Sequence, residues 1–224
     1  MGQALGVESN TSVVVRELQP SDYAAARRII ATAFAGEAFA FGMFSESPVD
    51  RLVGMTGEYG SWPWAPNPIV IGAEAAGLLV AVGMVTAPGE CHLCDDFDET
   101  TGPGATRAAR IEHEFQLACR RAHLDSALPR HGHISVVATD PFIQRAGVGR
   151  LVVGALLDRL WKTDAECAVL ECVTSRETFY EHFGFRRVVE FDDPGGPDLR
   201  TVLMRVDPVS LSGQTAILDP ALSP

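Results

Sequence analysis

The chain contains segments of two hydrophobic periods, and together they predict a sheet flanked by helices. Runs rich in β-branched residues, which favour strands, occupy 13–18, 68–73, 78–86, 134–139 and 169–173. Apolar residues recur at helical spacing after the turn at 20–22, at about 49–59, at 106–124 and from 148 onward. The resulting order, β-α-(α)-β-β-α-β-α-β-α-β-β, suits a mixed sheet with helices on its faces.

One stretch, residues 133–161, combines three elements in a fixed order. Residues 134–139 form an apolar run suited to a buried strand, and Asp140-Pro141 ends it because proline has no N–H for a sheet ladder. Residues 144–149 (QRAGVG) then lead directly into the helix that begins near 148. A strand, a glycine loop and a helix in this order direct free amide N–H groups and the positive end of the helix dipole at an anion.

The spacing of the two glycines excludes two common phosphate loops. A P-loop ends in Gly-Lys-Ser/Thr, and no lysine follows either glycine here. A dinucleotide-binding loop needs a third glycine three residues after Gly149, where this chain has Val152. What remains is Gln-x-x-Gly-x-Gly, which by itself fits a plain turn as well as it fits an anion site.

The same hexapeptide resembles motif A of the GNAT N-acetyltransferases, Gln/Arg-x-x-Gly-x-Gly/Ala. Downstream, residues 179–185 (FYEHFGF) resemble the end of that family's motif B, Phe-Tyr-Glu-x-x-Gly-Phe. Residues 193–197 (DPGGP), with Met204-Arg205 closing the next strand, resemble the branch that contains puromycin-type acetyltransferases. The resemblance covers 13–206 in element order, and its specific motifs lie between 133 and 206.

This resemblance implies an α/β (α+β) fold with a GNAT-like central sheet that is mixed, mostly antiparallel, split by a splayed parallel strand pair and flanked by helices. Residues 13–206 would form a single acetyltransferase domain, between a flexible N-terminus at 1–12 and a C-terminal tail at 207–224. The implied activity is transfer of an acetyl group from acetyl-coenzyme A (acetyl-CoA) to a small-molecule primary amine, by direct attack on the thioester. A non-catalytic acyl-coenzyme A-binding module and a structural domain in which the glycine loop is only a turn are the open alternatives.

The resemblance also implies the residues that bind the cofactor. Its pyrophosphate would lie against a loop made of Gln144, Arg145, Ala146, Gly147, Val148, Gly149 and Arg150. Its pantetheine arm would pair with the exposed strand edge at Val137, Ala138 and Thr139. Many relatives carry an asparagine before the motif B helix, and here Ser175 or Arg176 would take its place.

Catalysis needs a proton donor for the leaving thiolate and a proton acceptor for the amine. Tyr180 is the expected acid, since a phenol with a pKa near ~10 can protonate a thiolate whose thiol has a pKa near ~8.5. An amide near Val137 would polarise the thioester carbonyl. The base stays open among Glu37, Glu58, Glu112 and His113, and the aromatic residues between 36 and 68 would either line the acceptor pocket or cover the core.

Composition narrows the class of protein. A chain of 224 residues with 46% hydrophobic residues can bury one globular core. Its formal net charge of −11 argues against nucleic acid, and it would either attract a cationic amine or simply keep the protein soluble. No apolar run approaches the ~20 residues that span a bilayer, and 1–12 lack a signal-peptide pattern, so a cytoplasmic location without membrane contact is expected. The oligomeric state stays open, a homodimer included.

The five cysteines are odd in number, so they cannot all be paired in disulfides, and reduced thiols are expected. Cys91-His92-Leu93-Cys94 has the inner spacing of a zinc site. A structural zinc needs four ligands, however, and the chain has no second Cys-x-x-Cys and no His-x-x-x-His. The sequence pattern therefore predicts no metal site.

Overall fold

The computed structural model describes residues 12–65, 67–95 and 106–208. Within them the chain builds one seven-stranded sheet in the order β1-β2-β3-β4-β5-β7-β6. The strands are β1 Val13–Glu17, β2 Ile69–Ala75, β3 Leu78–Val85, β4 His131–Thr139, β5 Cys167–Val173, β6 Arg186–Asp192 and β7 Arg200–Val206. The flexible N-terminus expected at 1–12 and the C-terminal tail expected at 207–224 lie outside the described part of the chain, except for residues 12, 207 and 208.

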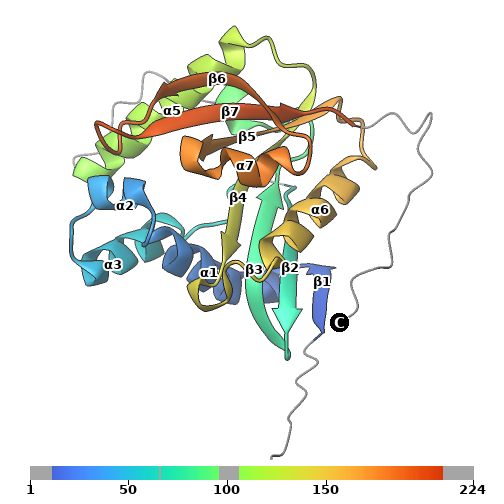
Figure 1. Ribbon diagram of the computed structural model, residues 1–224, viewed down its shortest axis with the longest axis horizontal. Helices are drawn as coiled ribbons and strands as arrows, with labels where there is room; N and C mark the ends of the chain where they lie inside the picture. The colour runs from blue at the N-terminus through green and yellow to red at the C-terminus, as the bar shows by residue number, and fades with distance from the viewer. Residues whose placement is uncertain (1–11, 66, 96–105, 209–224) are drawn as a thin grey trace, which may run out of the picture.

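Helices cover both faces of this sheet, as the sequence pattern predicts. They are α1 Tyr23–Phe34, α2 Ala38–Met43, α3 Pro48–Glu58, α4 His92–Asp95, α5 Arg107–Asp125, α6 Val148–Leu160 and α7 Glu177–Glu181. Figure 1 shows α6 and α7 in front of the sheet and α1 and α5 behind it. The two shortest of the early helices, α2 and α4, were not predicted. None of the described helices is long and apolar enough to cross a membrane.

The strand pairing confirms the predicted sheet. All neighbouring strands run antiparallel except β4 and β5, which are parallel. That parallel pair is joined only at its beginning, from His131 opposite Cys167 to His133 opposite Val169. Beyond this point β4 continues to Thr139 and β5 to Val173 without pairing with each other. The two strands therefore diverge, and we call the opening between them the fork.

A β-bulge at Ser135 changes which face each half of β4 presents. Against β3, Ile134 pairs with Val85 and Val136 pairs with Met84, so Ser135 is the extra residue. Because side chains alternate along a strand, the extra residue shifts the alternation by one. Ile134 therefore packs in the core beneath α6, whereas Val136, two residues further on, packs in the core beneath α1.

The larger core lies between the sheet and α6. This helix buries Val152, Val153, Leu156, Leu157 and Leu160. Gly132 on β4 leaves room for the last of these, since a Cβ there would stand 2.4 Å from a Leu160 methyl carbon. The close seating of α6 on the sheet fixes where the helix begins, at the end of the fork between β4 and β5.

Candidate active site

The glycine loop presents free backbone amides, as its sequence predicts. Gly147 has a φ of +81° and is the N-cap of α6, and Arg145 also lies in the left-handed region with a φ of +69°. The amides of Arg145, Gly147, Val148 and Gly149 donate to no acceptor among the described residues. These groups and the positive end of the α6 dipole could hold an anion at the start of the helix.

The loop lies against the end of β4 and against α7. A Cβ on Gly149 would stand 3.2 Å from the Thr139 hydroxyl oxygen and 3.6 Å from the Phe179 ring, so glycine allows this approach. Gln144 does not face the loop amides, because its side-chain nitrogen donates to the Thr139 carbonyl at 3.3 Å. Arg145 and Arg150 are exposed and form no ion pair with the described residues. Both guanidinium groups are therefore available to an anion.

The predicted pantetheine-binding segment, Val137–Thr139, lies beyond the last residue of β4 that pairs with β5, while its other edge pairs with β3. Its edge toward β5 has no strand partner in the described structure. Ser135, at the bulge below it, carries a buried hydroxyl oxygen without a hydrogen-bond partner among the described residues. The open edge and the loop amides thus lie along one continuous path, from the fork to the start of α6.

Tyr180 is a half-buried residue of α7 at the same fork. Its ring meets Phe179 and Phe185 edge-on, with centroids 4.9 and 5.9 Å away. Burial, reinforced by the nearby Cys172 thiol, raises the pKa of Tyr180, so its hydroxyl stays protonated at neutral pH. A group that must donate a proton to a thiolate is suited to this state.

An ion pair connects the α7 side of the fork with α2. Arg176, at the end of the short 3-10 turn Thr174–Arg176, donates to Glu37 at 2.6 Å, and Glu37 is the N-cap of α2. Both charges also act on the pKa of Tyr180, which Arg176 lowers and Glu37 raises. Glu37 therefore lies near Tyr180, the predicted acid. Ser175, the residue before Arg176 on the 3-10 turn, is exposed.

Two of the other candidate bases come together elsewhere. Glu112 of α5 is half-buried, and burial together with the charges of Glu58 and Asp193 raises its pKa to about 7. Its carboxylate accepts a hydrogen bond from Gln116 at 2.8 Å. Burial also raises the pKa of Glu58 at the end of α3. A carboxylate with a pKa near 7 is half-ionised at neutral pH, which suits a general base. His113 is the residue that follows Glu112 on α5.

Tyr59 lies near this acidic pair and within a group of aromatic rings. Tyr59 contacts Phe34 edge-on at 5.3 Å and Trp64 at 5.4 Å, and its pKa is raised by burial and by Glu112 and Glu58. The aromatic residues of 36–68 differ in how deeply they are buried. Trp62 is fully buried in the core beside Tyr23, whereas Trp64 is partly exposed.

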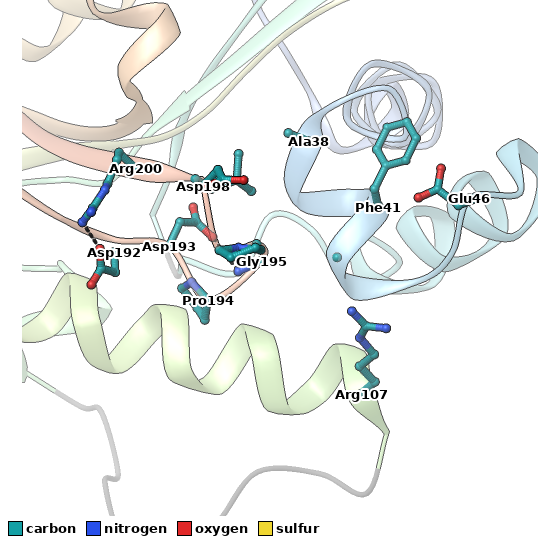
Figure 2. A pocket seen from close by; sticks show the side chains of 14 residues that line it. Ala38, Phe41, Glu46, Arg107, Asp192, Asp193, Pro194, Gly195, Asp198 and Arg200 are labelled. Atoms are coloured by element: carbon teal, nitrogen blue, oxygen red, sulfur yellow. Dashed lines mark hydrogen bonds and ion pairs between the residues drawn. The ribbon is translucent and has the colours of Figure 1, made fainter.

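A cavity of about 750 Å³ lies between α2, the start of α5 and the β6–β7 loop. Figure 2 shows Phe41 and Glu46 on one side of it, Arg107 at its rim and the loop from Asp193 to Asp198 opposite. The loop is held by Asp193, which accepts hydrogen bonds from the Gly195 amide at 2.8 Å and the Thr201 hydroxyl at 2.7 Å.

Two backbones meet at this cavity. A Cβ on Gly42 would stand 1.6 Å from the Gly195 carbonyl oxygen, so α2 and the loop touch at two glycines. Neither the cavity nor this contact was predicted, although residues 193–197 were singled out for their sequence. The charge of Asp193 reaches Glu112, which places the cavity and the acidic pair on the same side of the molecule.

Comparison with known proteins identifies the family. The model of the acetyltransferase (GNAT) family matches residues 57–185. No curated protein sequence matches the chain significantly. Among solved structures, a polyamine N-acetyltransferase from Drosophila melanogaster superposes with a TM-score of 0.61 at 12% identity, over 88% of this chain and all (100%) of that one. The ribosomal-protein-S18-alanine N-acetyltransferase from Escherichia coli gives 0.53 at 16% identity, over 88% and 94%.

A third structure, yncA from Salmonella typhimurium, was solved with its cofactor acetyl-CoA and gives a TM-score of 0.53 at 15% identity, over 87% of this chain and 93% of that one. At 12–16% sequence identity, these three comparisons show only that the folds are similar. The family match covers more than half of the chain and contains the glycine loop, the fork and Tyr180. The chain therefore belongs to the acetyltransferase (GNAT) family, whose enzymes transfer an acetyl group from acetyl-CoA.

Proposed function

We propose that this enzyme acetylates a small-molecule primary amine. The observation that carries the proposal is the free amides at the start of α6, which lie beside the open edge of β4 and close to the Phe179 ring of α7, the helix that also carries Tyr180. An elongated thioester with a pyrophosphate at one end fits this path. The five cysteines, all unpaired, favour the cytoplasmic location expected from the sequence.

The residues of the fork would hold acetyl-CoA in three places. The amides of residues 145 and 147–149, with Arg145 and Arg150, would bind the pyrophosphate. The open edge of Val137–Thr139 would pair with the pantetheine amides, and the backbone N–H near Val137 would polarise the thioester carbonyl. Ser175, exposed at the turn before α7, would contact the cofactor from the other side of the fork.

Proton transfer needs two groups with different pKa values. Tyr180, whose pKa is raised, would donate its proton to the departing sulfur. Glu112, with a pKa of about 7, would accept the proton of the attacking amine through water. Glu37 is the second candidate base, because it lies near Tyr180, but its ion pair with Arg176 gives it a positioning role instead.

The acceptor would enter from the side of α2, α5 and the β6–β7 loop. Glu58, Glu112 and Asp193 give this side negative charge, which favours a cationic amine. The cavity of about 750 Å³ has the size of a small-molecule site. The resemblance of the loop at 193–197 to puromycin-type acetyltransferases, which the cavity borders, supports a small drug-like acceptor.

A turnover screen over polyamines, arylalkylamines, aminoglycosides and aminonucleosides tests the proposal, with release of free coenzyme A as the readout. We expect turnover with at least one class and a loss of roughly 10²-fold or more in kcat for Tyr180→Phe, the range for a general acid. Tyr23→Phe, which removes a hydroxyl on α1 outside the fork, is the matched control. Tight binding of acetyl-CoA without turnover on any amine would favour the non-catalytic module, and no thermal shift at millimolar acetyl-CoA would contradict binding itself.

A further inference from the structure

A cluster of sulfur and imidazole side chains lies on the α5 face of the sheet, where β4 and β5 begin to diverge. One ligand atom from each of Cys91, Cys94, His123 and His131 lies within 4.8 Å of the others. Cys91 and His123 are 2% exposed and His131 is 7% exposed, so the cluster is buried. The acetyl-transfer chemistry proposed for the fork uses none of these residues.

The separations within the cluster are those of a tetrahedral metal site. The Cys91 sulfur lies 3.7 Å from Nδ1 of His123, and the Cys94 sulfur lies 3.7 Å from the same nitrogen. Zinc binds thiolate sulfur at about 2.3 Å and imidazole nitrogen at about 2.0 Å. A tetrahedral angle between such bonds separates sulfur from nitrogen by about 3.6 Å. One ion at the centre of the cluster would therefore reach these atoms with little movement.

Hydrogen bonds direct a lone pair of each histidine into the cluster. His131 donates from Nδ1 to the Pro129 carbonyl at 2.8 Å, so its Nε2 carries the lone pair. His123 bonds through Nε2 to the Glu171 carboxylate, which leaves Nδ1 facing both sulfurs. A backbone carbonyl or a carboxylate behind the ring is the usual support of a metal-binding histidine.

One of these lone pairs is unused without a metal. His131 Nε2 is a buried nitrogen with no hydrogen-bond partner among the described residues. Buried polar atoms in folded proteins nearly always have a partner, so an orphan among three other potential ligands requires an explanation. A bound cation supplies it.

Neighbouring groups support the four residues. Glu171, buried on β5, also bonds Nε2 of His133 at 2.7 Å, and Nδ1 of His133 lies 3.6 Å from the Cys91 sulfur. His133 thus lies against the Cys91 sulfur on one side while the Glu171 carboxylate orients its ring from the other. Arg120 of α5 donates to the carbonyls of Leu93 and Cys94 at 2.6 and 3.0 Å, which fixes α4 against α5.

We propose that Cys91, Cys94, His123 and His131 bind one structural zinc ion, with Glu171 and His133 as supporting residues. Two thiolates and two imidazoles are a common structural zinc set, and two thiolates neutralise the charge of the ion. The ion would join the loop after β3, α4, α5 and the first residue of β4. It would therefore stabilise the closed end of the fork, next to the last paired residues of β4 and β5.

Metal content measured on the full chain tests the site. The protein is produced with a removable tag that contains no histidine and is purified with a reductant and without chelator. Mass spectrometry of the metals is expected to find about one zinc per chain. Cobalt exchanged into the site without oxygen is expected to give a sulfur-to-cobalt charge-transfer band and the strong visible bands of tetrahedral coordination. A chelator is expected to lower Tm by several degrees, because the ion binds only the folded chain.

Matched variants locate the ion. Cys94→Ser and His131→Gln are each expected to lower zinc affinity by about tenfold or more. Cys172→Ser and His182→Gln, which change a thiol and an imidazole outside the cluster, are expected to retain the zinc. The metal content, the cobalt spectrum and the effect of the chelator on Tm are measured on the wild-type chain, so they do not depend on how a variant folds.

Three results would overturn the proposal. They are less than about a tenth of a zinc per wild-type chain before and after reconstitution with zinc chloride, an unchanged zinc content in the double variant Cys91→Ser/Cys94→Ser, and a Cys91–Cys94 disulfide in freshly purified protein. The readouts are metal content, spectrum and Tm, so a failure here is distinct from a failure of the acetyltransfer proposal.

Discussion

Replacing Glu112 by glutamine is expected to stabilise the protein above pH 7 and to slow acetyl transfer at the same time. In the folded chain the pKa of Glu112 is about 7, against an ordinary value of 4.5. Between these two pH values the folded state holds a proton that the unfolded state has released, so stability falls as pH rises. Each pH unit of difference corresponds to about 1.4 kcal/mol, which gives a loss of about 3 kcal/mol that is complete above pH 7.

Glutamine has the shape of the protonated acid and does not titrate, so the variant avoids this loss. Urea unfolding should show Glu112→Gln more stable than wild type by no more than about 1 kcal/mol at pH 5 and by up to about 3 kcal/mol at pH 8. Glu114→Gln changes an exposed carboxylate on the same helix and should differ from wild type by less than ~0.5 kcal/mol at both pH values.

The same variant tests the proposed base. If Glu112 accepts the amine proton, kcat on the best amine of the screen should fall by roughly 10²-fold or more in Glu112→Gln, and the rise of wild-type activity around pH 7 should disappear. A stability difference that is the same at pH 5 and pH 8 would refute the raised pKa. A pH-dependent stabilisation with full activity would support the raised pKa of Glu112 but contradict its role as the base. Glu37 would then be the remaining candidate base.

Two further changes test the loop and the core. Gly147→Val should lower the free energy of unfolding by ~1–3 kcal/mol, because residue 147 has a left-handed backbone conformation. Gly77→Val, at φ +75°, is the matched control with the same expected loss, and the added Cβ enters open space at both positions. Calorimetry should nevertheless find acetyl-CoA affinity reduced at least about tenfold only in Gly147→Val, and equal affinity in both would contradict the anion loop. Leu156→Ala, a fully buried change on α6, should lower the free energy of unfolding by ~2–5 kcal/mol in urea. Leu151→Ala, 47% exposed on the same helix, should lower it by less than ~1 kcal/mol.

The parts of the fold that were predictable from sequence are those fixed by local chemistry. Pro141 ends a strand because it has no N–H, and Gly147 begins a helix because it accepts a positive φ. The strand before them is longer than predicted, since β4 begins at His131. Histidine and glycine are weak strand formers, and there the pairing with β5 and the seat of Leu160 over Gly132 decide the structure.

The parts that could not be predicted depend on contacts between distant residues. The short helix α2 carries no clear periodicity, and it is placed by the approach of Gly42 to Gly195. The bulge at Ser135 lies between Ile134 and the pair Val136-Val137, and apolar residues on both sides of it hide a shift in the alternation. The raised pKa of Glu112 depends first on burial and then on the charges of Glu58 and Asp193, which lie far from Glu112 in the sequence.

The Cys/His cluster also could not be predicted from the sequence, because only two of its four residues are close along the chain. A sequence pattern registers ligands that are close along the chain, and only Cys91 and Cys94 satisfy that condition. His123 and His131 stand on a helix and on a strand, and tertiary packing brings them within 4.8 Å of the sulfurs. The available signal was the concentration of three of the six histidines between 123 and 133.

A single strand, β4, connects the two sites. Before the bulge its side chains His131 and His133 face α5 and the Cys/His cluster, while its backbone is still paired with β5. After the bulge its backbone edge is unpaired, and the proposed function needs that edge for the cofactor. Opening a sheet in its middle leaves unpaired N–H and C=O groups and removes the ladder that keeps two strands in register. The closed end must therefore be held by other bonds. Glu171 supplies such bonds to His123 and His133, next to the last residues of β4 and β5 that pair with each other. Substitutions that remove the metal site should therefore widen the fork and weaken acetyl-CoA binding as well as lower the stability of the fold.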